Sequence, residues 1–481
     1  MHLEAPTTHT ARKVKAWTCR LTPLGASALG LSLLAAGCNA SPFAWPSGDP
    51  NIILFLIDSL RADHLGAYGY PRDTSPAIDR LARDGVVFQN AIAPASWTRP
   101  SMGSLFTSLS PHVHGATTFG KTLPAEAVTL AETLQGRKYF TTAFQTNPLV
   151  AGEHFAQGFD TYYEIFGASG GHVVRDFLTW LDEREKRKFF AYVHFMDVHL
   201  PYDAPDENRA KFVGPYSGQL DPRRIGSQKQ IYDLLPTLTG ADRSHIIDLY
   251  DAGINQVDDS IEFIVRELKR RKLFDDTIVI VTSDHGEELF DHGGFEHGHS
   301  MHREVVQVPL IIRNPRLPAR GVRVKQLVRL IDVFPTVLGF LRVDIPAPLM
   351  GRDLGPAIAD PNLDWNLEGF SEGVMYGPNQ AAIQKGPLKM IQIDPAVYKF
   401  QAKFFERLPP TPGWTAESGA VEFFNLETDP NELHPVAGHP MEPAWGRLLA
   451  GYRAAGVSLA GAPEPIDEKR MEQLKSLGYI R

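Results

Sequence analysis

The sequence predicts an α/β protein with a large, mostly parallel central sheet flanked by helices, followed by a smaller C-terminal α+β domain with a short antiparallel sheet. Between residues 50 and 290, apolar segments without polar alternation recur, and each ends in polar or ionisable residues. A long segment with helical spacing of apolar residues separates two of them, and after about residue 365 the segments become shorter. Strands buried on both faces that alternate with helices are typical of parallel sheets covered by helices.

Residues 1–37 are predicted to be a lipoprotein signal peptide, outside this fold. Four basic residues precede an apolar run over residues 21–36, which is too short for a comfortable transmembrane span. The run ends in LAAGC and resembles the lipobox of bacterial lipoproteins, which implies cleavage before Cys38 and lipidation of its sulfur. Ordinary secretion with an incidental cysteine is the alternative.

We therefore expect an exported protein that is lipid-anchored to a bacterial membrane, in the periplasm or at the cell surface. Residues 38–49, rich in Pro, Ser and Gly, are predicted to form a tether. Cys19 and Cys38 are the only cysteines, so no disulfide and no catalytic thiol is expected in the mature chain. Removing the leader, with its four basic residues and Glu4, changes the formal charge from −8 to −11. This acidic balance argues against nucleic acid as a partner and requires a local cation for an anionic substrate.

The predicted catalytic α/β domain spans residues 50–365 and opens with the strand NIILFLID, which ends at Asp58. Three later segments have the same form: RKYFTTAFQTN (137–147), KFFAYVHFMDVH (188–199) and TIVIVTSDHG (277–286). A helix is predicted over residues 248–271, where apolar residues keep helical spacing and cationic residues collect at the C-terminal end. Open α/β sheets bind ligands at the carboxyl ends of their strands, so Asp58 is a candidate site residue.

Residues 366–481 are predicted to form the C-terminal subdomain. QAAIQKG, PLKMIQI and VEFFNL are short strand-like segments joined by turn residues, which favours a small antiparallel sheet. A charged terminal helix is predicted at IDEKRMEQLKSLGYI.

The segment TSDHGEELFDHGGFEHGHSMHRE carries the strongest signal for chemistry, because it follows a buried strand and is rich in histidine. Asp284 and His285, together with Asp58 at a second strand end, could supply oxygen and nitrogen ligands to a divalent cation. Such a cation would hold a substrate oxygen and lower the pKa of a hydroxyl. Solvated loop residues are the alternative.

The chain resembles the sulfatase family of the alkaline phosphatase superfamily. The matching segments, in family order, are NIILFLIDSLRADHLGAYGY, TRPSMGSLFTS followed by PHVHG, MDVHLPY, the block from SDHGEE to VPLIIR, FFNLETDPNE and LKSLGYI. The resemblance implies that Asp58, Asp284 and His285 bind one divalent cation (calcium, magnesium, manganese or zinc) and that Thr98 is the nucleophile. A hydroxyl that forms a turn or caps a helix beginning near Pro100 is the alternative for Thr98.

The same resemblance implies further site residues. His199, His297 and His299 are candidates for the catalytic histidine that protonates the leaving oxygen. Candidate substrate-binding residues are Arg99, His114 and Asn147.

The nucleophile loop departs from the family pattern in ways that affect its chemistry. No formylglycine cofactor is expected, because oxidation of the Thr98 hydroxyl carbon would give a ketone. Met102 stands where the family has Arg, and Ser59 where many sulfatases have a second Asp. Asn147 occupies the region in which many relatives have Lys and His.

The sequence thus predicts a metal-dependent hydrolase of sulfuric or phosphoric esters. A sulfated threonine cannot collapse to an aldehyde and must be attacked by water, as phosphorylated threonine is in related enzymes. The substrate is expected to be an anionic ester, such as a sulfated glycan or a phosphorylated envelope component. The alternatives are a phosphotransferase or phosphodiesterase acting on envelope lipids or glycans, and a catalytically lapsed glycan-binding lipoprotein.

Overall fold

The structure is a computed structural model that describes residues 12–13, 48–318, 320–345, 348–399, 420–456, 458–459, 468, 471–472 and 474. The predicted lipidation site Cys38, most of the leader and tether, and most of the predicted terminal helix lie outside the described residues. Within the described part, no helix combines the length and apolar character needed to cross a membrane.

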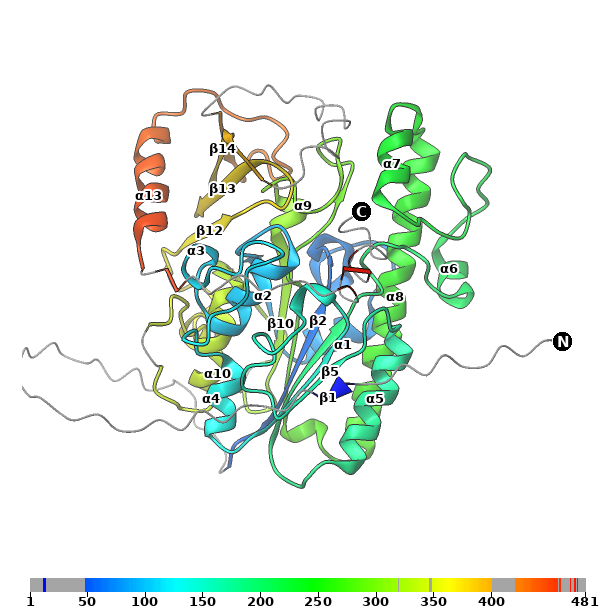
Figure 1. The fold of residues 1–481 in the computed structure, drawn as a ribbon, viewed down its shortest axis with the longest axis vertical. Coiled ribbons are helices and arrows are strands. Elements are labelled where there is room, and N and C mark those ends of the chain that lie inside the picture. Colours follow the sequence, from blue (N-terminus) through cyan, green and yellow to red (C-terminus); the bar gives the residue numbers. More distant parts are fainter. Residues whose placement is uncertain are drawn as a thin grey trace, which may run out of the picture.

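The central sheet has nine strands and is mostly parallel, as predicted (Figure 1). Its strands, from one edge to the other, are β1 (Arg12–Lys13), β5 (Thr161–Glu164), β4 (Phe140–Gln145), β6 (Phe189–Phe195), β2 (Asn51–Ile57), β7 (Thr277–Thr282), β10 (Gln307–Arg313), β3 (Val86–Ile92) and β11 (Val322–Arg329). Neighbours from β5 to β7 are parallel, β10 runs antiparallel to β7 and β3, and β11 is parallel to β3. The short β1 pairs antiparallel with β5. Strands β2, β4, β6 and β7 are the four predicted from apolar runs.

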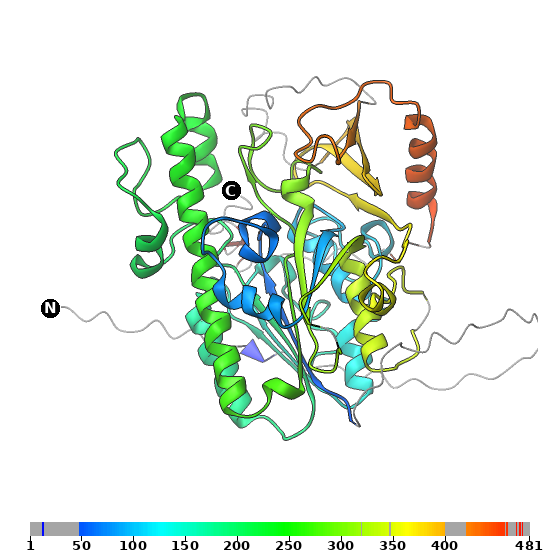
Figure 2. The ribbon, with the colours of Figure 1, turned by 180° about the vertical axis from the view of Figure 1, so that it is seen from behind.

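Helices cover both faces of this sheet, which explains why β2 is apolar without alternation (Figures 1 and 2). Ile53, Phe55 and Ile57 belong to a core that includes α1 (Pro76–Arg83), α5 (Gly170–Glu183) and α8 (Gly240–Arg270). The alternate residues of β2 belong to a second core that includes α2 (Thr98–Thr107), α4 (Leu130–Gly136) and α10 (Val333–Phe340). Successive side chains of a strand point to opposite faces, so both faces of β2 require apolar residues.

Helix α8 confirms the predicted helix of residues 248–271 but begins earlier, at Gly240. Thr239 and Asp242 form a capping box there, with the Thr239 hydroxyl accepting a bond from the Asp242 amide. Its C-terminal turn carries Lys269 and Arg270, which complement the negative end of the helix dipole.

The C-terminal part forms a four-stranded antiparallel sheet, as predicted, with the order β12 (Glu368–Glu372), β13 (Gly377–Lys385), β14 (Leu388–Lys399) and β15 (Val421–Asn425). On one face, Trp445 and Leu449 of α13 (Glu442–Ala454) pack against it. On the other face, Met301 of the histidine-rich segment and Val306 of α9 (Arg303–Val306) pack against Ile391. The small sheet is therefore held between α13 and the histidine-rich segment.

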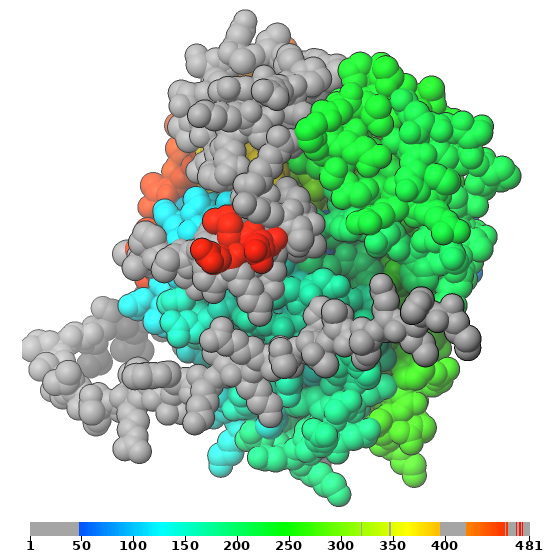
Figure 3. Space-filling model, turned by 45° about the vertical axis from the view of Figure 1, so that its right-hand side comes forward, coloured from blue at the N-terminus to red at the C-terminus, as the bar shows by residue number. Residues whose placement is uncertain are grey.

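Shorter elements connect these layers. They are α3 (Pro111–His114), α6 (Asp206–Phe212), α7 (Gln228–Leu234), α9 (Arg303–Val306), α11 (Gly355–Ala359), β8 (Glu288–Leu289), β9 (Phe295–Glu296), and the 3₁₀ helices Ala62–His64, Gly66–Tyr68, Pro148–Val150, Leu235–Thr237, Phe274–Asp276 and Leu330–Asp332. Helices α6 and α7 belong to the green region on the upper right of Figure 3. Tyr232 of α7 donates its hydroxyl proton to the Phe295 carbonyl (3.0 Å), so this region contacts the segment that carries His297.

Candidate active site

The three predicted metal ligands come together at the carboxyl ends of two neighbouring strands. Asp58 follows β2, and Asp284 and His285 follow β7. All three residues are fully buried, and one ligand atom of each lies within 4.8 Å of the others. Nε2 of His285 lies 3.6 Å from Oδ1 of Asp58 and 3.3 Å from Oδ2 of Asp284.

The electrostatics of this group fit a divalent cation. Oδ2 of Asp284 is buried and has no hydrogen-bond partner among the described residues. Burial, and then the negative charge of Asp58, raise the pKa of Asp284 well above its ordinary value. Two adjacent buried carboxylates are costly without positive charge between them. Two carboxylates and an imidazole are ligands that zinc, manganese and other divalent ions accept, so the residues present suit such an ion.

Asp58 is held by two side chains that donate to the same oxygen, Oδ2. Asn147 donates from Nδ2 at 2.7 Å, and Nε2 of His194 lies 3.2 Å away. The other ring nitrogen of His194, Nδ1, bonds to the Tyr192 hydroxyl at 2.8 Å. Burial raises the pKa of Asp58, but the bond from His194 and nearby histidines lower it below its ordinary value. Asn147 was predicted to contact substrate, whereas His194 was not singled out, although it is a polar residue inside an apolar strand.

Thr98 lies beside the carboxylates, at the first position of α2. The residue is fully buried, its Oγ1 lies 3.2 Å from Nε2 of His285, and Nδ2 of Asn147 lies 3.4 Å from the same oxygen. The N-cap of α2 is the extended residue Trp97, so the Thr98 side chain does not cap this helix. Ser101 donates to the Asp284 carbonyl at 2.6 Å and so attaches the first turn of α2 to the end of β7.

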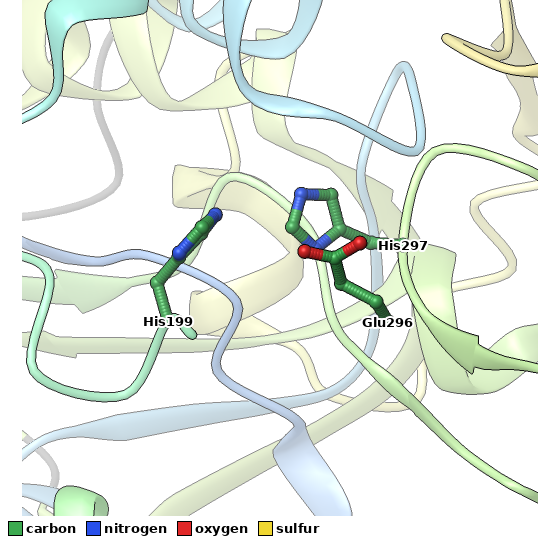
Figure 4. Close-up of side chains that lie close together, drawn as sticks. All are labelled: His199, Glu296 and His297. Carbon is green, nitrogen blue, oxygen red and sulfur yellow. The ribbon is translucent and has the colours of Figure 1, made fainter. Parts of the chain in front are cut away.

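His199 and His297 form a second group next to the first, together with Glu296 (Figure 4). The ring centroids of His199 and His297 are 5.1 Å apart, and those of His285 and His297 are 4.2 Å apart. Burial and the neighbouring histidines lower the pKa of His297 well below its ordinary value. His199 bonds through Nδ1 to the Leu200 carbonyl at 2.5 Å. A carbonyl only accepts, so Nδ1 carries the proton and Nε2 is the basic nitrogen of neutral His199.

Two glutamates that the sequence analysis did not single out support this group. Oε1 of Glu287 lies 2.8 Å from Nδ1 of His297, and Oε2 accepts a bond from the Tyr202 hydroxyl at 2.9 Å. Glu296 has a positive φ of 75°, and burial raises its pKa to about 8. A non-glycine residue in this region of φ is uncommon outside functional sites and tight turns. Their only sequence signal is their place beside Asp284, His285 and His297.

His299, the third candidate catalytic histidine, lies apart from this group. Its Nε2 bonds to Glu288 at 2.6 Å and its Nδ1 contacts the His297 carbonyl at 3.3 Å. Burial lowers the pKa of His299, but the bond to Glu288 outweighs it and the net shift is upward. Gly298, with a φ of 80°, breaks the extended backbone that would have placed His297 and His299 on one face.

Two predicted substrate-binding residues also make structural contacts. Nε2 of His114 lies 3.0 Å from the Ser104 hydroxyl and 3.1 Å from the Pro100 carbonyl, and its Nδ1 accepts a bond from the Ala116 amide at 3.1 Å. Burial lowers the pKa of His114 to about 4, so this imidazole is neutral and joins α2 to α3. Arg99 donates to the Lys121 carbonyl at 2.6 Å, and its guanidinium lies 5.4 Å from the Phe155 ring centroid.

Comparison with known proteins identifies the family of this chain. The family model described as Sulfatase matches residues 50–343, more than half of the chain. The chain belongs to the sulfatase family. It is therefore an ester hydrolase of the sulfuric or phosphoric ester class.

Curated relatives are distant in sequence, but the alignments cover most of this chain and most of each relative. The chain is 24% identical over 429 residues to an ulvan-active sulfatase of Formosa agariphila, covering 81% of this chain and 78% of that protein. It is 24% identical over 503 residues to PehA of Trinickia caryophylli, a multifunctional alkaline phosphatase superfamily protein, covering 85% and 94%.

Solved structures share the fold. BT4656, solved in complex with its substrate D-glucosamine-2-N,6-O-disulfate, has a TM-score of 0.68 at 18% identity, covering 89% of this chain and 98% of that one. The phosphonate monoester hydrolase of Agrobacterium radiobacter has a TM-score of 0.66 at 21% identity, covering 87% and 98%. At these identities the likeness establishes the fold: a mostly parallel sheet with a small antiparallel sheet at the C-terminus.

Proposed function

We propose that this sulfatase-family protein hydrolyses phosphoric, phosphonic or sulfuric esters through Thr98 as a covalent nucleophile. The observation that carries the proposal is the place of the Thr98 hydroxyl, 3.2 Å from His285 and beside two buried carboxylates. A structural threonine at a helix start needs no such surroundings. A divalent cation held by Asp58, Asp284 and His285 would lower the pKa of the hydroxyl and neutralise the charge of the bound ester.

In the first step the Thr98 hydroxyl loses its proton to solvent, Oγ1 attacks the phosphorus or sulfur of the ester, and the bond to the leaving oxygen breaks. Asn147 supports this attack, because its Nδ2 lies near both Thr98 and Asp58 and can donate to an oxyanion formed there. The positive end of the α2 dipole, at which Thr98 lies, favours the same negative charge.

The leaving oxygen needs a proton, and His199 and His297 are the best placed donors. Burial lowers the pKa of both imidazoles, so each is neutral in the free protein. A bound anionic ester would favour their protonated forms, since an opposite charge nearby stabilises the imidazolium. The same histidine could then take a proton from the water that cleaves the threonine ester.

Threonine favours phosphoryl over sulfuryl chemistry at this site. A sulfate ester on a formylglycine hydrate is released by collapse to the aldehyde, whereas Thr98 has no second hydroxyl on its carbon. The covalent intermediate must therefore be opened by attack of water on phosphorus or sulfur. Covalent catalysis of this two-step kind is the route available to phosphorylated hydroxyl side chains.

Side-by-side turnover of an aryl sulfate, an aryl phosphate, an aryl phosphodiester and an aryl phosphonate tests the proposal. We expect the phosphorus esters to be cleaved faster, and Thr98→Ala to lose turnover of every ester. Thr179→Ala is the control, because Thr179 is an exposed residue on α5 whose hydroxyl bonds only within its own helix. Unchanged turnover by Thr98→Ala would refute the nucleophile.

The natural substrate is proposed to be an anionic ester of a glycan or envelope component, reached from a lipid anchor at Cys38. The sequence around Cys38 supports the anchor, and the acidic chain makes a local cation necessary for an anionic substrate. Incorporation of a labelled fatty acid into wild-type protein, and its loss in Cys38→Ser, is the expected result. Cleavage before Cys38 would also remove β1 and leave β5 as the edge of the sheet.

A further inference from the structure

A second group of metal-ligating side chains lies where the catalytic domain contacts the small C-terminal sheet. His292 lies in the loop after β8, His302 directly precedes α9, and Glu304 lies in α9. One ligand atom of each lies within 4.8 Å of the others. None of the three belongs to the groups around Thr98 and His199, so the proposed ester chemistry does not use them.

Two ligand atoms of this group are buried without a hydrogen-bond partner in the part of the chain that the structure describes. They are Nδ1 of His302 and Oε2 of Glu304. His302 is 8% exposed and Glu304 is 4% exposed. A buried polar atom without a hydrogen-bond partner destabilises the folded state, so two of them within one small group indicate a bound partner.

The outer contacts of both imidazoles are those of metal-bound histidines. Nε2 of His302 lies 3.0 Å from a carboxylate oxygen of Glu422, and Nε2 of His292 lies 2.9 Å from the Glu432 carbonyl. Ligating histidines usually donate their far N–H to a carboxylate or carbonyl, which leaves the near nitrogen basic. In both residues the near nitrogen is Nδ1. Nδ1 of His292 lies 2.8 Å from Oε1 of Glu304, which is an acceptor, so this nitrogen carries a proton here and a bound ion would displace it.

The two rings also lie together in space. They stack with centroids 3.8 Å apart and an interplanar angle of 8°. The lone pair of each Nδ1 lies in its ring plane, so an ion bound by both imidazoles requires the rings to turn out of this parallel stack until their Nδ1 atoms and the Glu304 carboxylate converge. Two imidazoles and one carboxylate suit zinc and similar transition metals better than calcium or magnesium, which prefer oxygen ligands.

We propose that His292, His302 and Glu304 form a transition-metal site of the zinc type, separate from the active site. Glu422 belongs to β15 and Glu432 to the loop that follows, so the outer contacts come from the C-terminal subdomain while the ligands come from the catalytic domain. A bound ion would therefore strengthen the contact between the two. Because an ion bound only to the folded state stabilises it, thermal stability should rise with the concentration of free zinc.

Zinc binding to the full chain, stripped with a chelator and studied in an Asp284→Asn background, tests this site apart from the active site. We expect His302→Phe, which keeps an aromatic ring against His292, to bind one equivalent of zinc less than its Asp284→Asn parent. Glu304→Gln should lose the same equivalent, and Glu422→Gln, which changes only an outer contact, should weaken its affinity roughly 10–100-fold. In each case far-ultraviolet circular dichroism checks that the variant is folded.

His172→Ala is the matched control, because His172 lies exposed on α5 and bonds only to Ser169. Its zinc stoichiometry and melting temperature should equal those of the parent. The site is overturned if folded His302→Phe and Glu304→Gln both bind as much zinc as the parent, or if the parent binds none. Failure of the ester hydrolysis assays would leave this result unaffected, since none of these residues takes part in the proposed reaction.

Discussion

His194 is a positioning residue whose replacement should weaken metal binding without removing a ligand. It is fully buried, and Nε2 lies 3.2 Å from Oδ2 of Asp58. A hydrogen bond to a charged group contributes about 1.5–3 kcal/mol, which corresponds to roughly 10–150-fold in an equilibrium constant. Asn147 donates to the same oxygen at 2.7 Å, so the carboxylate keeps one donor when His194 is lost. The lower end of the range, about tenfold, is therefore expected.

His194→Phe keeps the ring volume and removes both nitrogens. Activity titrated against free divalent cation should give an apparent metal affinity about tenfold weaker, while turnover at saturating metal changes much less. Tyr192→Phe is the control, because it removes only the outer bond between the Tyr192 hydroxyl and Nδ1 of His194. Its metal affinity should lie between those of the wild type and His194→Phe. Wild-type metal affinity in folded His194→Phe would refute the role, as would a loss of turnover that saturating metal cannot restore.

Three further predictions concern stability and metal. Gly103→Ala should lower the free energy of unfolding by about 1–3 kcal/mol, because the new Cβ would lie 2.6 Å from Cε1 of His114. Gly136→Ala in α4 is the control, because its Cβ meets no atom within 4 Å, and denaturant unfolding measures both variants. His112 bonds to Glu372 at 2.6 Å, which outweighs burial and raises the His112 pKa. This stabilisation is complete below the ordinary histidine pKa and is lost as pH rises through the raised value, so His112→Gln should make the free energy of unfolding less dependent on pH in that window. Chelation should abolish ester hydrolysis and added divalent cation should restore it; full activity in metal-free protein contradicts the assigned ligand set.

The sheet could be predicted because its central strands are buried on both faces, and such strands consist of consecutive apolar residues without polar alternation. Strand β10 was not among the predicted strands, and its direction does not follow from the sequence, since VPLIIR is equally apolar in a parallel or an antiparallel strand. Strand β3 was not predicted at all, because two of its residues are only half-buried and interrupt the apolar run.

The proximity of Asp58, Asp284 and His285 could be predicted because strand ends gather at one edge of a parallel sheet. Asp58 and Asp284 follow neighbouring strands, and the order of strands decides their proximity. The role of His194 depends on β6 lying next to β2, which the sequence does not specify. His299 was a candidate beside His297 in the family pattern, and the positive φ of Gly298 directs it towards Glu288.

The most direct test of Thr98 as the nucleophile is to identify the residue that carries the covalent intermediate. Acid quenching during turnover of a slow aryl phosphate or phosphonate, followed by proteolysis and mass spectrometry, locates the adduct. We expect the added group to lie on Thr98 and Thr98→Ala to carry none. An adduct on another side chain, or turnover by Thr98→Ala at the wild-type rate, would contradict this expectation.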